Sequence, residues 1–194
     1  MIEIEIRGEL TKEQFEKLGS FMRANGRHTK SQDREMILLR GYKGYDEDPT
    51  KRDTDMRLRN TNGKCEIMLK RKMSDGNRAR KEYSLVLTEN TLDTAKEIVK
   101  AFGCEGGLWM HRLTEAFEYK DIEWALIEAP RGDGFEMLLY EAEMEIEDGG
   151  DITATHKKIT DEAKALGLPV LETDELNRDF IYKLDKEVNR EILF

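Results

Sequence analysis

Glu3, Glu5 and Arg7 are the first residues in the sequence whose types and spacing could support chemistry. They alternate with isoleucine in the stretch IEIEIRG, which starts at residue 2. This alternation predicts a β-strand, because successive side chains of a strand point to opposite faces. One face is then apolar, and the other carries two carboxylates and a guanidinium group. The charged face indicates either a solvated sheet surface or the wall of a cavity that holds a metal ion and an anion.

A second acidic row lies near the other end of the chain, where Glu141, Glu143 and Glu145 alternate with apolar residues. Same-face neighbours in a strand lie roughly 6–7 Å apart, so ionised carboxylates in a row repel one another unless water or cations offset their charge. A closed barrel can place this strand beside the first one, where Glu3 and Glu5 would meet the second row. An oxygen-only site of this kind suits a hard divalent cation, and we expect Mg²⁺ or Mn²⁺.

Basic residues are concentrated between these two acidic segments. From Arg57 to Lys81 the sequence has nine basic residues and two acidic ones. Alternation places several of them on shared strand faces. The residues expected to form a cationic wall are Arg57, Arg59, Lys70, Lys72 and Arg80. The forked guanidinium groups of arginine suit phosphate oxygens, and lysine adds a point charge. A ligand that matches both the cationic wall and the acidic metal site is a polyanion that brings a metal, such as a triphosphate.

Strands joined mostly by short turns must position these side chains, and short turns imply antiparallel neighbours. The first helix is marked by a capping box, Thr11 with Gln14, and by Gly26 as a stop signal. Turns are expected at SDGN (74–77) and PRGDG (130–134). Strands are expected at 2–7, 34–42, 55–59, 64–72, 78–87, 108–120, 121–129 and 135–148, and helices at 12–25, 92–103, 151–167 and 174–190.

A barrel built from these strands must either point its apolar face inward or cover that face with helices and line its lumen with charge. Two amphipathic helices and a helical tail are available as a cover. The pattern therefore predicts an α+β fold: an eight-stranded antiparallel β-barrel, or tunnel, with a charged lumen, covered by helices and followed by a helical C-terminal tail. No linker, repeat or low-complexity tract divides the chain, so we expect a single domain over residues 1–194.

Composition excludes several other classes of protein. The net charge of -9 argues against non-specific nucleic-acid binding. Cys65 and Cys104 form no CxxC pair, which suits a reducing cytoplasm, and three histidines are a poor stock for a zinc site. No apolar run approaches the length of a membrane span. We expect a cytoplasmic protein without a membrane partner, with a homodimer left open as an alternative to a monomer.

The ordered strand motifs resemble those of the CYTH family, the triphosphate tunnel metalloenzymes. EIEIR resembles the ExExK signature that opens these proteins, MRLR their RxR strand, IMLKRK their lysine-bearing strand and RKEYS their RxExE strand. YEAEMEIEDG resembles their closing ExE strand, and a helix and an LGL turn follow it. The resemblance covers nearly the whole chain. It implies an eight-stranded antiparallel tunnel, acidic on one side and cationic on the other, that binds a triphosphate with a divalent metal.

The resemblance also implies roles for individual residues. The implied metal ligands are Glu3, Glu5, Glu141 and Glu143; the pair Glu143 and Glu145 fits almost as well if the register of the last strand shifts. The implied phosphate-binding residues are Arg57, Arg59, Lys70, Arg80 and, as a later basic position, Arg112. The implied catalytic residues are Glu5, Arg7 and Glu128, which stands near where the family often has Asp.

Three departures from the family pattern occur, at Arg7, at Ser84 and at Asn177-Arg178, which replaces the family's common Ser-Lys. Arg7 replaces the signature lysine, and because arginine does not deprotonate, its role is electrostatic. Ser84 replaces the second Glu of RxExE and removes one carboxylate. The expected activity is metal-dependent hydrolysis of an inorganic, organic or nucleoside triphosphate. The alternatives are a class IV-type adenylyl cyclase that makes cyclic AMP and pyrophosphate, a non-catalytic polyphosphate- or nucleotide-binding module, and a structural domain with a charged surface.

Overall fold

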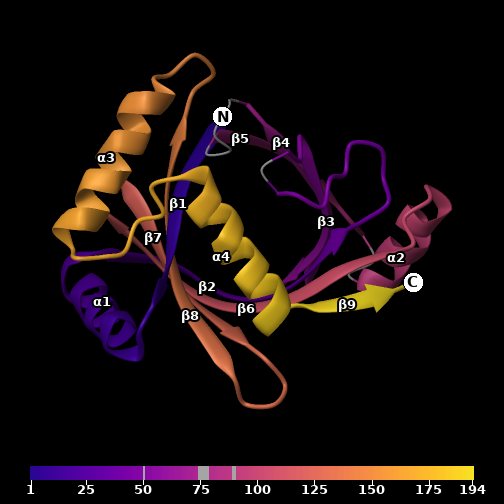
Figure 1. Ribbon diagram of the computed structural model, residues 1–194, viewed down its shortest axis with the longest axis horizontal. Helices are drawn as coiled ribbons and strands as arrows, with labels where there is room; N and C mark the ends of the chain where they lie inside the picture. Colours follow the sequence, from indigo (N-terminus) through magenta and orange to yellow (C-terminus); the bar gives the residue numbers. More distant parts are fainter. Residues whose placement is uncertain (50, 74–78, 89–90) are drawn as a thin grey trace.

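The computed structural model describes residues 1–49, 51–73, 79–88 and 91–194 (Figure 1). The strands in these ranges are β1 (Ile2–Leu10), β2 (Arg27–Leu39), β3 (Thr54–Thr61), β4 (Lys64–Lys72), β5 (Ala79–Val86), β6 (Gly106–Tyr119), β7 (Ile122–Pro130), β8 (Glu136–Ile146) and β9 (Arg190–Leu193). The helices are α1 (Lys12–Asn25), α2 (Leu92–Ala101), α3 (Ile152–Ala165) and α4 (Asp174–Glu187). The turn expected at 74–77 lies outside the described residues.

Strands β1 to β8 form a closed antiparallel ring. Their order is β2-β3-β4-β5-β1-β8-β7-β6, and pairing of β6 with β2 closes the ring. The first strand and the last strand of the ring are neighbours, with Glu5 opposite Glu143. The predicted eight-stranded antiparallel tunnel is therefore confirmed. The short β9 adds to the same sheet by pairing with the first residues of β6.

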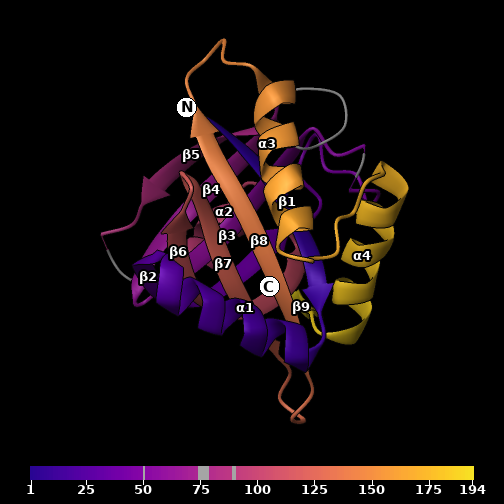
Figure 2. The same cartoon turned by 90° about the vertical axis from the view of Figure 1, so that its left-hand side faces the viewer.

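The apolar faces of the ring point outward and form the core beneath the helices. Ile4 of β1 and Trp124 of β7 are fully buried in one cluster with Met22 of α1 and Ile159 of α3. Figure 2 shows α1 and α3 lying across the outer face of β1, β7 and β8. Helix α2 packs on β3 and β4, where Val99 joins a second cluster. The charge is thus inside the ring and most of the apolar packing outside it. The exception is α4, whose Phe180 and Leu184 pack with Ile127 and Leu139, which line the interior cavity.

Helix α1 begins where its capping box predicted. The backbone N–H of Thr11 donates to Gln14 Oε1 at 3.0 Å, and the backbone N–H of Gln14 donates to Thr11 Oγ1 at 3.2 Å. These two bonds satisfy donors that the first helical turn leaves without partners. Helix α2 begins in a similar way, because the Thr91 side chain accepts from the backbone of Thr94. The helices of the described ranges lack the length and apolarity of a membrane span.

The expected boundaries of two elements were wrong. The second strand was expected at 34–42, but β2 begins at Arg27 and ends at Leu39. Its first half is polar on both faces, so no alternation marks it, yet pairing with β6 satisfies its backbone from Arg27 onward. The final helix was expected to reach residue 190, but α4 ends at Glu187 and the chain enters β9. Four residues are too few for a periodic signal.

Gly107 lies where β6 approaches β2 too closely for a side chain. A Cβ at this position would lie 2.3 Å from the backbone oxygen of Leu38. The ring-closing strand pair must then shift, and overpacking of this kind costs about 1–3 kcal/mol. We expect Gly107→Ala to lower the melting temperature by roughly 2–12 °C, measured by circular dichroism.

Gly132, in the turn after β7, offers a matched control for this substitution. A Cβ there meets nothing within 4 Å. We expect Gly132→Ala to melt within about 2 °C of wild type, since surface changes away from special features have small effects. If the melting temperature of Gly107→Ala is no lower than that of Gly132→Ala, β6 does not approach β2 as closely at Gly107 as described.

Candidate active site

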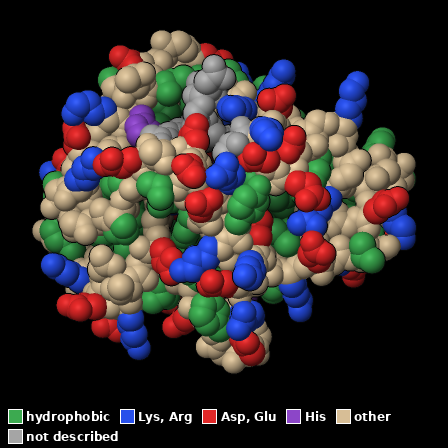
Figure 3. Space-filling view, viewed as in Figure 1, with side chains coloured by type: hydrophobic (Ala, Val, Ile, Leu, Met, Phe, Trp, Pro, Cys, Tyr) green, Lys and Arg blue, Asp and Glu red, His purple; other side chains and the backbone are tan. Residues whose placement is uncertain are grey.

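The interior of the ring contains a cavity of about 420 Å³. Such a volume is in the range of small-molecule sites. Its acidic lining residues are Glu3, Glu5, Asp55, Glu82, Glu123, Glu141, Glu143, Glu145 and Asp185, and its basic ones are Arg7, Lys30, Arg34, Arg52, Arg57, Arg59, Lys70, Arg80 and Arg112. Figure 3 shows that charges of both signs are also mixed over the outer surface. Inside the ring, acidic residues predominate on β1, β7 and β8 and basic ones on β2, β3, β4 and β6, with Arg7 and Asp55 as exceptions.

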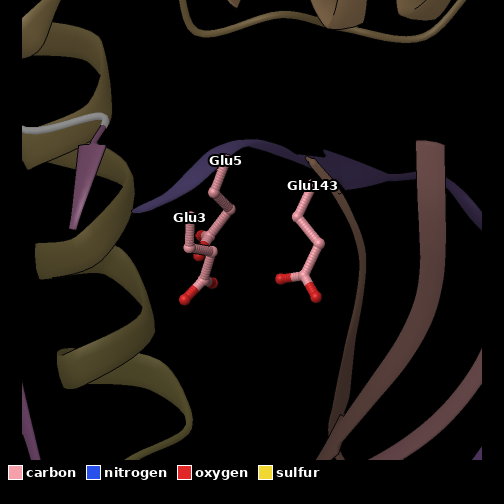
Figure 4. Close-up of side chains that lie close together, drawn as sticks. All are labelled: Glu3, Glu5 and Glu143. Carbon is pink, nitrogen blue, oxygen red and sulfur yellow. The ribbon is translucent and has the colours of Figure 1, made fainter. Parts of the chain in front are cut away.

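The acidic wall comes from the adjacent strands β1 and β8. In their register Glu5 lies opposite Glu143 and Glu3 lies opposite Glu145. Glu3, Glu5 and Glu143 each offer a carboxylate oxygen within 4.8 Å of the others (Figure 4). Figure 4 shows the three side chains pointing into the same space. Glu145 also lines the cavity but is more exposed than this cluster.

The electrostatics of this cluster fit a divalent cation. Burial raises the pKa of Glu143 far above its usual range, and the neighbouring charge of Glu3 adds to the effect. Burial also opposes ionisation of Glu3, but the charge of Lys70 and hydrogen bonds with Glu82, Glu143 and Lys70 together outweigh it and lower the pKa of that carboxyl to about 2. Three carboxylates this close cannot all ionise without a cation between them. The oxygen-only donor set and its need for positive charge suit Mg²⁺ or Mn²⁺.

Lys70 joins the cationic wall to the acidic wall. Its Nζ lies 3.2 Å from both carboxylate oxygens of Glu3 and also forms an ion pair with Glu82 of β5. Lys70 is a β4 residue, whereas Glu3 belongs to β1. The ammonium group therefore supplies positive charge beside the carboxylates that would hold a metal. Movement of Lys70 toward a phosphate would expose Glu3 to a cation.

Arginines of β3 and β5 form the main part of the cationic wall. Arg57 and Arg59 lie two residues apart on the same face of β3, and both line the cavity. Arg59 Nε donates to Glu66 Oε1 at 2.6 Å, which fixes the guanidinium plane. Arg80 of β5 donates from Nη1 to Asp55 Oδ2 at 2.6 Å. Arg57 and Arg59 have further N–H donors that a phosphate could use, because a guanidinium carries five.

Arg34 is a lumen cation that was not among the predicted site residues. It lies on β2, donates from Nε to Thr61 Oγ1 at 3.1 Å, and donates from Nη2 to Gln32 Oε1 at 2.6 Å. Burial lowers its pKa, and the nearby charge of Arg59 lowers it further. Gln32, Arg34 and Met36 lie two residues apart and share the lumen face of β2, so a strand predicted from an earlier residue would have included Arg34.

Arg112 is buried at the end of the cavity near α4. Its Nη2 donates to Asn189 Oδ1 at 2.7 Å, and its Nη1 donates to the backbone oxygen of His111 at 2.7 Å. Asn189 in turn donates from Nδ2 to Asp185 Oδ1 at 2.8 Å. Burial lowers the pKa of Arg112 to about 10, still well above neutral pH. The guanidinium is charged and held by the segment that follows α4.

The structure brings most of the predicted site residues together. Those that line the cavity are Glu3, Glu5, Arg7, Arg57, Arg59, Lys70, Arg80, Arg112, Glu141, Glu143 and Glu145. Arg7 forms an ion pair with Glu5 and lies 3.5 Å from Glu141 through Nη1 and Oε1. Lys72 and Glu128 are not among the lining residues. On β7 the lining positions are 123, 125 and 127, so period-two alternation puts Glu128 on the other face and Glu123 in the lumen.

This chain matches known proteins in its three-dimensional structure but not in its sequence. No protein-family model and no curated protein matches the sequence. Solved structures do match. A protein from Pyrococcus horikoshii OT3 superposes with a TM-score of 0.72 at 21% identity, over 93% of this chain and 99% of the other. A candidate adenylate cyclase from Vibrio parahaemolyticus has a TM-score of 0.64 at 13% identity, over 93% and 98%.

A third similar structure carries a stated activity. It is a candidate adenylyl cyclase from Hippeastrum with a dominant triphosphatase activity, and it has a TM-score of 0.55 at 16% identity. The match covers 87% of this chain and 89% of that one. Structural similarity at such low sequence identity shows a shared fold but does not show a shared activity. Together with the closed ring, its charged lumen and its ordered strand motifs, these matches show that the chain has the CYTH, or triphosphate tunnel, fold.

Proposed function

We propose that this protein is a divalent-metal-dependent hydrolase of a triphosphate substrate. The observation that carries the proposal is that a three-carboxylate cluster and a wall of arginines face one cavity. A triphosphate with its metal matches both charge patterns, whereas a simple anion or a simple cation matches only one. The triphosphatase activity of the similar Hippeastrum protein supports the same class of substrate.

The roles of the residues follow from their places in the lumen. Arg57, Arg59 and Arg80 would bind phosphoryl oxygens and offset the negative charge that grows in the transition state. Glu3, Glu5 and Glu143 would hold Mg²⁺ or Mn²⁺. When bound, the cation neutralises phosphate charge and polarises the phosphoryl group under attack.

Other lumen residues would orient the groups that react. Arg7 pairs with Glu5 and Glu141, and because it stays protonated it would fix the positions of these carboxylates. Glu141 lies outside the three-carboxylate cluster. Its free oxygen lone pairs would accept a hydrogen bond from the attacking water and hold that water in line with the scissile bond.

One feature of the cavity favours a second candidate function, adenylyl cyclase. Part of the lining is apolar and includes Met36, Leu38 and Met110, whereas Ile127 and Leu139 pack against α4. An apolar section beside the charged walls could accept a nucleoside, and polyphosphate alone would have no use for it. In the cyclase reaction the ribose 3′-hydroxyl replaces water as the nucleophile and pyrophosphate leaves.

A product assay tests these proposals. The protein is incubated with tripolyphosphate, ATP or thiamine triphosphate, each with Mg²⁺ or Mn²⁺, and phosphate, pyrophosphate and cyclic AMP are measured. Phosphate release that requires the metal supports the hydrolase. Cyclic AMP with pyrophosphate supports the cyclase, tight binding without products supports a binding module, and no binding at all rejects all three.

A further inference from the structure

Asp55 is a carboxylate in the middle of the cationic wall. It lies on the inward face of β3, two residues before Arg57, and it lines the same cavity. Its exposed fraction is 4%. A buried acidic group in a wall that binds anions works against their binding, so its presence there requires a reason.

Three arginines donate to this carboxylate. Asp55 Oδ2 accepts from Arg57 Nη2 at 3.1 Å and from Arg80 Nη1 at 2.6 Å. Its other oxygen, Oδ1, accepts from Arg52 Nη1 at 3.1 Å. Arg52 is itself buried and also donates from Nε to the backbone oxygen of Asp46 at 2.8 Å, so the loop before β3 is tied to the same carboxylate.

The carboxylate is ionised at neutral pH. Burial alone would raise the pKa of Asp55, but Arg57, Arg80 and Arg52 together hold it well below its usual range. One negative charge therefore balances part of the charge on three guanidinium groups. The oxygen shared by Arg57 and Arg80 lies between them as a phosphate oxygen would.

Asp55 leaves donors of Arg57 for a ligand. A guanidinium has five N–H donors, and Asp55 accepts from Arg57 through Nη2. In the described part of the chain, Arg57 Nε is buried without a hydrogen-bond partner. The carboxylate thus fixes the direction of the Arg57 and Arg80 guanidinium groups while it competes with an incoming anion for their charge.

We propose that Asp55 is a positioning residue that aligns Arg57 and Arg80 for the phosphoryl groups and weakens their hold on the anion, so that products leave. This inference rests on the proposed triphosphatase function. Without Asp55 the wall would bind substrate and product more tightly alike. Uniformly tighter binding of substrate and product lowers KM and does not increase kcat. Loss of the alignment of the Arg57 and Arg80 guanidinium groups decreases kcat.

The test compares wild type with Asp55→Asn. Tripolyphosphate binding without metal is measured by calorimetry, and kcat and KM for tripolyphosphate are measured with Mg²⁺. We expect the variant to bind at least fivefold more tightly, with KM lowered at least fivefold and kcat lowered at least tenfold. Asp55→Glu keeps the charge but moves the carboxylate, so its binding should stay within twofold of wild type while its kcat falls.

Asp133→Asn serves as the control. Asp133 is exposed and pairs with Arg131 at 2.7 Å, so this change removes the same charge far from the lumen. It should leave binding, KM and kcat within twofold of wild type. If it shifts binding as much as Asp55→Asn does, the effect is one of net charge and the proposal fails.

The remaining outcomes separate this proposal from the proposed function. Unchanged or weaker binding by Asp55→Asn, while wild type binds and hydrolyses tripolyphosphate, overturns the role of Asp55 alone. A wild type that neither binds nor hydrolyses any of the three triphosphates overturns both. If Asp55→Asn is unfolded in buffer, tripolyphosphate should refold it, and failure to do so also overturns the role of Asp55.

Discussion

Glu5→Gln should reduce triphosphate hydrolysis by about 10²–10³-fold while the variant keeps its fold. The substitution keeps the shape of the side chain but removes one negative charge from the cluster of Glu3, Glu5 and Glu143. A cation held by this cluster would lose an ionised ligand, and with it the charge that stabilises the transition state. Steady-state kinetics at fixed Mg²⁺ and calorimetric titration with Mn²⁺ measure both effects.

The stability of this variant gives an independent readout. In metal-free buffer, Glu5→Gln relieves repulsion with Glu3 but also removes the ion pair with Arg7, so the melting temperature should change little. Glu9→Gln is the matched control, since Glu9 lies on the same strand but is exposed and pairs with Lys183 at 2.6 Å. It should retain activity within twofold. Normal turnover and Mn²⁺ binding in Glu5→Gln would reject the metal assignment.

Lys70→Met should change metal binding and turnover in opposite directions. The ammonium lies against Glu3 and Glu82, so its removal leaves Glu3 without its principal counter-charge. Mn²⁺ affinity without substrate should therefore rise several-fold, as an incoming cation no longer competes with Lys70. Turnover of tripolyphosphate should fall about 10²-fold, because a cationic contact to the transferring phosphoryl group is lost.

Lys64→Met provides the comparison for this prediction. Lys64 begins the same strand, β4, but is exposed and does not line the cavity. The Lys64→Met variant should keep both its Mn²⁺ affinity and its turnover within twofold of wild type. Weaker Mn²⁺ binding by Lys70→Met would contradict a competition between the lysine and the metal, whatever its effect on turnover.

The ring was predictable because its faces alternate strictly. Ile2, Ile4 and Ile6 are buried outside the ring, and Glu3 and Glu5 lie inside it, as a period of two requires. The adjacency of the first and last strands also followed from closure, because a closed ring leaves no free edge. Most of the charged residues that line the lumen could therefore be named from spacing and motif order.

Pairing between lumen side chains could not be predicted from the sequence. Lys70 contacts Glu3, and Arg112 contacts Asn189 at 2.7 Å, although each pair is far apart in the chain. These contacts depend on the stagger of the strands and on where α4 ends, which a single-strand pattern does not specify. Asp55 could be placed on the lumen face by alternation, but its three arginine partners depend on packing between β3, β5 and the loop that holds Arg52.

The side-by-side position of β1 and β8 has a consequence for synthesis. Glu5 leaves the ribosome early, whereas its neighbour Glu143 follows only after most of the chain has been made. At cellular elongation rates this delay is on the order of ten seconds. A nascent chain cannot assemble the carboxylate cluster of Glu3, Glu5 and Glu143 during that time, so the cluster forms only when translation has passed β8. An incomplete product that stops before β8 therefore lacks one of the three carboxylates and one strand of the ring.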